Sequence, residues 1–235
     1  MAAPLLDPDR EGQSIARKKL ELDGYVLVRD RELGIGQDHR EHIHRTFFNG
    51  SILRRYDNDV PADRLRARDV VRYHWADGEL ELREHDTIAI ENRGEHTGRR
   101  EFDRVAVLRD RVLKHWIHGV LHLVPENLRQ PSGTFGINFF RTFTNVVTRP
   151  HQDGEEYIIV YVVDKIGGGA RTQLCGLDHD EILVEDELHP GDLIVVRDDR
   201  FRHNATPLTP PPDGPARRDA LVCTVNYPHT YRISP

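Results

Sequence analysis

The chain after residue 134 contains seven short apolar runs, and this pattern constrains the fold more than any other feature of the sequence. In chain order the runs are TFGINFFRTF, EYIIVYVVD, ARTQLCGL, EILVE, DLIVV, RFRHNATP and DALVCTVNY. Turn-forming residues separate them, and they recur about every 8 to 14 residues. This spacing indicates an antiparallel sandwich, because alternating βαβ units need a helix between successive strands. We therefore predict an α+β protein whose core is a double-stranded β-helix, a jelly-roll or cupin-like fold.

The first part of the chain is predicted to supply helices that pack against this core. Apolar spacing predicts helices at 7–23, 38–48 and 102–124. The last of these has the widest apolar stripe, and Pro125 ends it. Short strands are expected at 25–28, 70–75 and 87–91. The rest of the charged region 54–100 is expected to be loop. We predict one domain over 1–235, with a helical and mixed part at 1–133 and the β-helix, including any metal site, at 134–235.

Composition narrows the class of protein. The 235 residues carry a formal net charge of −6, and an acidic balance argues against a nucleic-acid partner. No apolar run approaches the roughly 20 residues of a membrane-spanning helix. Asp7 also comes too early for the apolar core of a signal peptide. Cys175 and Cys223 provide neither a disulfide framework nor a thiolate zinc site. We therefore expect a cytoplasmic protein without a membrane partner, in which any metal is held by nitrogen and oxygen.

Fourteen histidines offer such nitrogen ligands, and two of their groups lie on predicted helices. His115, His118 and His122 follow three- and four-residue steps and share one helix face. No carboxylate shares that face, and nearby arginines oppose a bound cation, so we expect it to be a solvated surface. His42 and His44 are two residues apart on a helix and therefore point apart. They are expected to be surface residues.

The third group is His151, Asp153 and His203. On an extended chain, residues i and i+2 point to the same side, so His151 and Asp153 can hold one metal together. His203 lies on a later predicted strand, which antiparallel folding can return to the same place. Two imidazoles and one carboxylate with open positions form the facial triad of non-haem iron(II) oxygenases. A pair such as His-x-Asp also arises by chance in a histidine-rich chain, and the strand context favours the metal interpretation.

Arg218 is a candidate for binding an organic co-substrate. It opens the last predicted strand, soon after His203. The planar fork of arginine suits the distal carboxylate of a dicarboxylic acid better than the point charge of lysine does. The alternative is an exposed strand end, because Arg217 is adjacent and only one of the two side chains can point inward.

Three segments resemble a known enzyme family. They are PHQDGEEYIIVYVVDKIGGGARTQL at 150–174, HPGDLIVVRDDRFRHNATPL at 189–208 and RRDALVCTVNY at 217–227. Together they resemble iron(II)/2-oxoglutarate-dependent dioxygenases, and most closely the bacterial branch that hydroxylates free aliphatic amino acids such as isoleucine. The first half of the chain carries no motif of this kind.

The resemblance implies a reaction and a set of site residues. His151, Asp153 and His203 would be the catalytic iron ligands, and Arg218 would bind 2-oxoglutarate. With Fe(II), 2-oxoglutarate and O2, such an enzyme hydroxylates an unactivated C–H bond and releases succinate and CO2. Halogenases of this type lack the carboxylate ligand, so Asp153 favours hydroxylation.

A free amino-acid substrate needs charged partners for both of its groups. Arg141 is the candidate for the substrate carboxylate, although it would lie among aromatic residues and needs a partner there; the alternative is a solvated side chain. Glu155 or Glu156 could meet the ammonium group. Three other functions remain open: a cupin-type thiol dioxygenase or isomerase without 2-oxoglutarate, a 2-oxoglutarate-dependent desaturase or cyclase acting on a natural-product intermediate, and a non-enzymatic binding module.

Overall fold

A large antiparallel sheet forms the centre of the protein. The computed structural model describes residues 5, 7–56, 64–86, 88, 90–92, 98–100, 102–143, 149–179 and 181–226. The strand order in this sheet is β1-β11-β7-β14-β6-β2-β3. The bounds are β1 Tyr25–Arg29, β2 Leu65–Ala76, β3 Glu79–Glu84, β6 Ser132–Thr142, β7 Tyr157–Ile166, β11 Asp192–Arg197 and β14 Arg217–Val225. The four runs predicted for β6, β7, β11 and β14 are confirmed as neighbouring strands of this sheet.

A smaller sheet lies against the large one. It has the order β10-β9-β12, with bounds β9 Thr172–Cys175, β10 Ile182–Asp186 and β12 Arg202–Ala205. Leu174 of this sheet and Phe201 pack against Val162, Ile194 and Val196 of the large sheet. Two short pairs complete the strands: β8 Gly168–Gly169 with β13 Leu208–Thr209, and β4 Ile90–Asn92 with β5 Gly98–Arg100. The two packed sheets confirm the predicted jelly-roll core.

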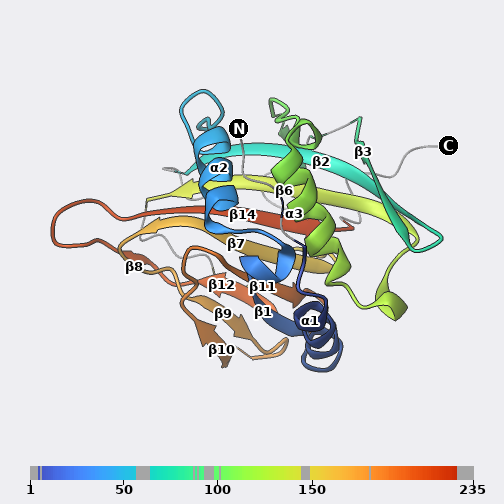
Figure 1. The fold of residues 1–235 in the computed structure, drawn as a ribbon. Coiled ribbons are helices and arrows are strands. Elements are labelled where there is room, and N and C mark those ends of the chain that lie inside the picture. The colour runs from blue at the N-terminus through green and yellow to red at the C-terminus, as the bar shows by residue number, and fades with distance from the viewer. Residues whose placement is uncertain are drawn as a thin grey trace.

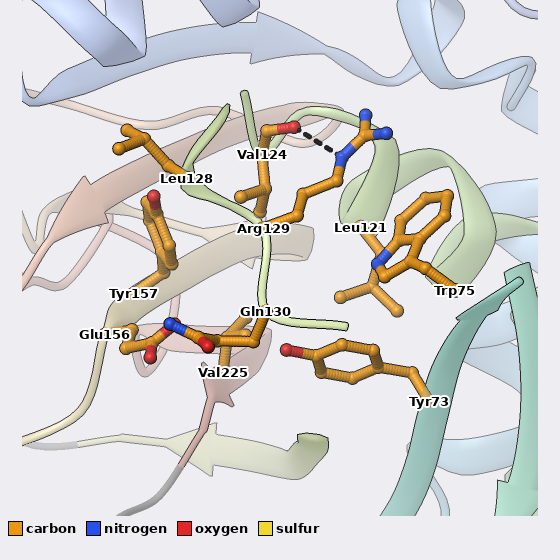
Figure 2. Close-up of a pocket in the computed structure, with 10 residues that line it drawn as sticks. All are labelled: Tyr73, Trp75, Leu121, Val124, Leu128, Arg129, Gln130, Glu156, Tyr157 and Val225. Atoms are coloured by element: carbon orange, nitrogen blue, oxygen red, sulfur yellow. Dashed lines mark hydrogen bonds between the residues drawn. The ribbon is translucent and has the colours of Figure 1, made fainter. Parts of the chain in front are cut away.

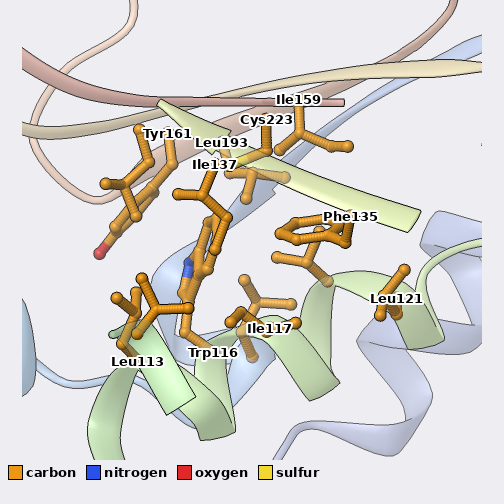
Figure 3. Close-up of a cluster of buried hydrophobic side chains, with 14 of the residues drawn as sticks. Leu113, Trp116, Ile117, Leu121, Phe135, Ile137, Ile159, Tyr161, Leu193 and Cys223 are labelled. Atoms are coloured by element: carbon orange, nitrogen blue, oxygen red, sulfur yellow. The ribbon is translucent and has the colours of Figure 1, made fainter. Parts of the chain in front are cut away.

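The helices cover the other face of the large sheet (Figure 1). They are α1 Arg10–Asp23, α2 Gln37–Phe47 and α3 Arg111–His122, with 3-10 turns η1 Asp30–Leu33, η2 Val107–Arg109 and η3 Glu126–Leu128. Figure 3 shows the main core, where Leu113, Trp116, Ile117 and Leu121 of α3 face Phe135, Ile137, Ile159, Tyr161, Leu193 and Cys223 of the sheet. The described helices are too short or too polar to cross a membrane.

The first part of the chain contains more strand than expected. The strands predicted at 25–28 and 70–75 are confirmed as β1 and as part of β2. Residues 54–100 were expected to be mostly loop, but the structure has the long strand β2 and its neighbour β3 there. The large sheet therefore takes β1, β2 and β3 from before residue 134. The reason is that β2 pairs along almost its whole length with β6, and this non-local pairing overrides a weak local pattern.

The predicted helix over 102–124 is also shorter than expected. Asp110 caps α3, accepting a hydrogen bond from the Leu113 N–H at 2.8 Å. The preceding segment instead runs beside β2, where the Val105 N–H donates to the Arg68 carbonyl and Arg104 pairs with the buried Asp69. Tertiary contacts thus hold residues that local spacing assigned to the helix.

The three histidines on α3 are partly buried, contrary to the expected solvated face. Burial, followed by the charges of His122, Lys114 and His115, lowers the pKa of His118 to about 4. Burial also lowers the pKa values of His115 and His122, and the His122 ring packs edge-on against Trp75. The three imidazoles are therefore part of the packing around α3, and they stay neutral near pH 7.

Stability is expected to fall as the pH drops from about 6.5 to about 4. The unfolded chain protonates His118 near the ordinary pKa, whereas the folded chain keeps the imidazole neutral until about pH 4. The unfolded state thus binds more protons in this window, and acid favours it. Denaturant unfolding at several pH values should show a smaller loss for His118→Gln than for wild type and for the exposed control His179→Gln. Identical pH profiles would contradict this expectation.

Candidate metal centre

The three predicted iron ligands come together between the two sheets. His151 and His203 form an antiparallel bridge, with the His203 N–H donating to the His151 carbonyl at 2.8 Å. Carboxylate oxygens of Asp153 lie 3.7 Å from His151 Nε2 and 3.6 Å from His203 Nε2. One ligand atom from each residue can be chosen so that all three lie within 4.8 Å of one another. This donor set suits Fe(II) with open coordination positions.

The orientation of each imidazole leaves its Nε2 for a metal. His151 Nδ1 lies 2.8 Å from the Arg149 carbonyl, which accepts a hydrogen bond from the protonated nitrogen. His203 pairs directly with Leu174, whose side chain is buried between the sheets, so His203 points into the same space. Its side chain is 16% exposed, against 42% for His151 and 39% for Asp153. The cluster is therefore closed on the His203 side and open on the other.

Asp198 supports the cluster from behind, and no sequence motif singled it out. Its Oδ2 accepts hydrogen bonds from the Gly154 N–H at 2.7 Å and the Glu155 N–H at 3.1 Å, while Oδ1 lies 3.5 Å from His203 Nδ1. Burial would raise the pKa of Asp198, but His203 and the two N–H groups outweigh it and hold that pKa below its usual value. One buried carboxylate thus connects two segments that carry predicted metal ligands.

Asp198→Asn is expected to weaken Fe(II) binding by about 10- to 100-fold, because the carboxylate behind a ligating imidazole fixes its orientation and raises its basicity. Anaerobic Fe(II) titration of the variant would measure this loss. The matched control is Asp199→Asn, since Asp199 is an exposed neighbour that pairs with Arg197. Equal affinities of wild type and both variants would show that Asp198 does not position the ligand.

Arg218 points into the space between the sheets. It lies opposite Thr142 on β6, on the face of β14 that also carries Ala220, which pairs with the inward-facing Val162. Its Nε and Nη2 atoms are buried and have no hydrogen-bond partner among the described residues. Burial and the charge of Arg64 lower the pKa of Arg218 to about 10, so it remains a cation at neutral pH. Two unpaired N–H groups of one planar fork match the chemistry of a bound carboxylate.

The structure does not bring Arg141 to the cluster. Arg141 shares a face of the large sheet with Phe139, which packs against α2, whereas Arg218 is on the opposite face. Its Nε and Nη2 donate to the buried carboxylate of Asp219 at 2.7 and 2.6 Å. Asp219 is thus the partner that a charged side chain among aromatic residues needs. The guanidinium that was predicted to bind the substrate is engaged in this ion pair.

Another group of possible ligands lies around Asp219. His44 Nε2 is 2.8 Å from Asp219 and 3.6 Å from Asp164, so His44, which was expected to be a surface residue, is instead partly buried in ion pairs. Arg141 and Arg217 also pair with these carboxylates. Two fixed cations at the same oxygens oppose a metal ion, and the group is an ion-pair network that connects α2 to β14.

Glu155 is the remaining acidic group near the predicted iron ligands. Burial raises its pKa well above the usual value, and the charge of Asp153 raises it further, while Arg68 and Thr224 lower it. Its Oε2 is buried without a hydrogen-bond partner among the described residues.

The cavity in Figure 2 is separate from the predicted iron ligands. It lies beneath the C-terminal end of α3, and with about 10 Å³ it holds no more than a water molecule.

Comparisons with known proteins place this geometry in a family. Residues 55–224 match the family model described as 2OG-Fe dioxygenase. Similar solved structures include a bsmA homologue from Methylobium petroleophilum (19% identity, TM-score 0.72, covering 94% of this chain and 96% of that one). IDO from Bacillus thuringiensis is similar at 14% identity and TM-score 0.65, covering 92% and 99%. A prolyl-4-hydroxylase from Pseudomonas putida is similar at 12% identity and TM-score 0.53, covering 91% and 98%. No curated protein matches the sequence. The family match spans most of the chain and contains all three clustered residues, and the chain belongs to the 2OG-Fe dioxygenase family.

Proposed function

We propose that this member of the family hydroxylates an unactivated C–H bond of a small amino acid or a similar metabolite. Family membership gives Fe(II), 2-oxoglutarate and O2 as its cofactor and co-substrates. The observation that carries the proposal is the convergence of His151, Asp153 and His203 within 4.8 Å, with a carboxylate as the third ligand. A carboxylate in that position leaves no place for halide, which favours hydroxylation over halogenation.

The chain's own residues have separate tasks in this proposal. His151, Asp153 and His203 would hold Fe(II) on one side and leave the opposite positions for small molecules. Arg218 would bind the distal carboxylate of 2-oxoglutarate through its unpaired Nε and Nη2. When bound, iron would activate O2 as the oxidant for C–H hydroxylation, and decarboxylation of 2-oxoglutarate to succinate and CO2 would supply the other two electrons. The protein supplies orientation, and the packed sheets keep bulk water from one side of the site.

Turnover of a panel of free amino acids tests the proposal. Purified protein with Fe(II), 2-oxoglutarate and air should release succinate faster when a substrate amino acid is added. Mass spectrometry should find that the product has gained one oxygen atom, whereas a desaturase or cyclase product loses two hydrogens. If no amino acid increases succinate release but another metabolite does, the amino-acid assignment is overturned. Membership of the dioxygenase family would not be affected by that result.

A further inference from the structure

Glu155 places a carboxyl group beside the predicted iron ligands. The bend after Asp153 begins at Gly154, whose φ of 78° is in the left-handed region that favours glycine. The N–H groups of Gly154 and Glu155 both donate to Asp198, which fixes this bend. The next residue, Glu156, turns elsewhere and accepts a hydrogen bond from Asn226 Nδ2 at 2.7 Å. The backbone thus directs two adjacent acids to different places.

The groups around Glu155 belong to the side of the large sheet that faces the iron site. The charges of Asp153 and Arg68 act on its carboxyl group, and the Thr224 side chain interacts with it. Arg68 and Thr224 flank Gly136 on the large sheet: a Cβ added there would lie 2.8 Å from Thr224 Oγ1 and 3.4 Å from Arg68 Nη2. Arg68 also donates to Asn138 Oδ1 at 2.8 Å. The Glu155 carboxyl group is therefore held near a polar wall of the inter-sheet space.

One oxygen of this carboxyl group is available to a ligand. Glu155 Oε2 is buried and has no hydrogen-bond donor among the described residues, which is unfavourable for a polar atom. The space between the sheets also contains the unpaired donors of Arg218. The Arg218 donors suit the anionic co-substrate 2-oxoglutarate. The acceptor oxygen of Glu155 therefore remains for a hydrogen-bond donor on the substrate. A protonated amine suits it best, because it offers N–H donors together with the positive charge that a buried carboxyl group needs as a partner.

We propose that Glu155 binds the protonated amine of the substrate. This inference rests on the proposed function and narrows the substrate class to molecules with a free, basic amine. An N-acylated amine carries no positive charge and is expected to be excluded. Glu155 is then the residue that distinguishes a free amino acid from its acylated form.

The test compares Glu155→Gln with the adjacent control Glu156→Gln, using the amino acid that gives the fastest succinate release. Glu155→Gln should raise KM for that amino acid about 100-fold and change kcat less than about 3-fold, because it removes binding made equally in the ground and transition states. The anaerobic Fe(II)–2-oxoglutarate charge-transfer band should be the same in wild type and both variants. An unchanged KM in Glu155→Gln, or loss of the band, would overturn the role of Glu155.

The N-acetyl derivative of the same amino acid provides a test on wild-type protein that needs no variant. Its turnover should be at least about 100-fold slower by kcat/KM, the loss expected for a missing charge-assisted contact. Equal turnover of the free and acetylated forms would overturn the inference while leaving the hydroxylase function in place. If no amine stimulates succinate release but an amine-free acid does, the amino-acid proposal itself fails.

Discussion

Replacing His203 with alanine is expected to abolish Fe(II) binding at micromolar metal and to lower turnover by about 1,000-fold or more, a loss of about 4 kcal/mol of transition-state stabilisation. His203 is the most enclosed of the three predicted ligands, and its backbone pairs with that of His151. Removing its imidazole leaves only two protein donors, which are too few to retain Fe(II). Anaerobic Fe(II) titration and succinate release measure the two effects.

The control for this substitution is His179→Ala, because His179 is an exposed histidine outside the cluster. Thermal unfolding without metal should give similar midpoints for wild type and both variants, which separates metal loss from misfolding. Full iron binding by a folded His203→Ala protein would show that His203 is not a ligand. The remaining histidines would then have to be tested in turn.

Arg218→Ala is expected to raise KM for 2-oxoglutarate about 100-fold, equivalent to about 2.7 kcal/mol, because a bidentate contact with a carboxylate is lost. Arg218→Lys should fall between wild type and alanine, since lysine keeps the charge but not the planar fork. Initial rates at varied 2-oxoglutarate give these values. The control is Arg171→Ala, because Arg171 is half-exposed and pairs with Glu185 on the surface.

Arg218 also distinguishes the family reaction from a cupin reaction that needs no co-substrate. Its buried Nε and Nη2 lack partners among the described residues, so their removal leaves no acceptor unsatisfied. The folded protein should therefore tolerate the alanine substitution. A variant that folds and turns over 2-oxoglutarate normally would assign Arg218 to another role.

Local sequence patterns predicted the elements well where burial repeats along a short stretch. The apolar runs that predicted β6, β7, β11 and β14 reflect strands that are buried along most of their length. Prediction found only residues 70–75 of β2, whose partner β6 is far along the chain, and it began α3 too early, where Arg104 is held by Asp69. Neither contact leaves a local signal, because each depends on which segments meet after folding.

The candidate site divides in the same way. The spacing His151-x-Asp153 and the later His203 indicated a shared metal site because strand geometry puts i and i+2 side chains on one side. The sequence could not choose between the two sides of a strand for Arg141 and Arg218. The observed register pairs Arg141 with Asp219 and leaves Arg218 facing inward. The sequence also could not distinguish Asp198 from Asp199, or Glu155 from Glu156, because adjacent residues of the same type differ only in the direction of their side chains.

Residue type and spacing along the chain were enough to predict a β-rich core and a nitrogen and oxygen donor set that includes one carboxylate. The partners of the charged residues around this predicted set are visible only in the folded chain. The fold places Asp198 behind His203, holds the Glu155 backbone against Asp198, and binds Arg141 into an ion pair on the helix side. The physical reason is that residue type is local, whereas side-chain direction and partner depend on strand register and on contacts between distant segments.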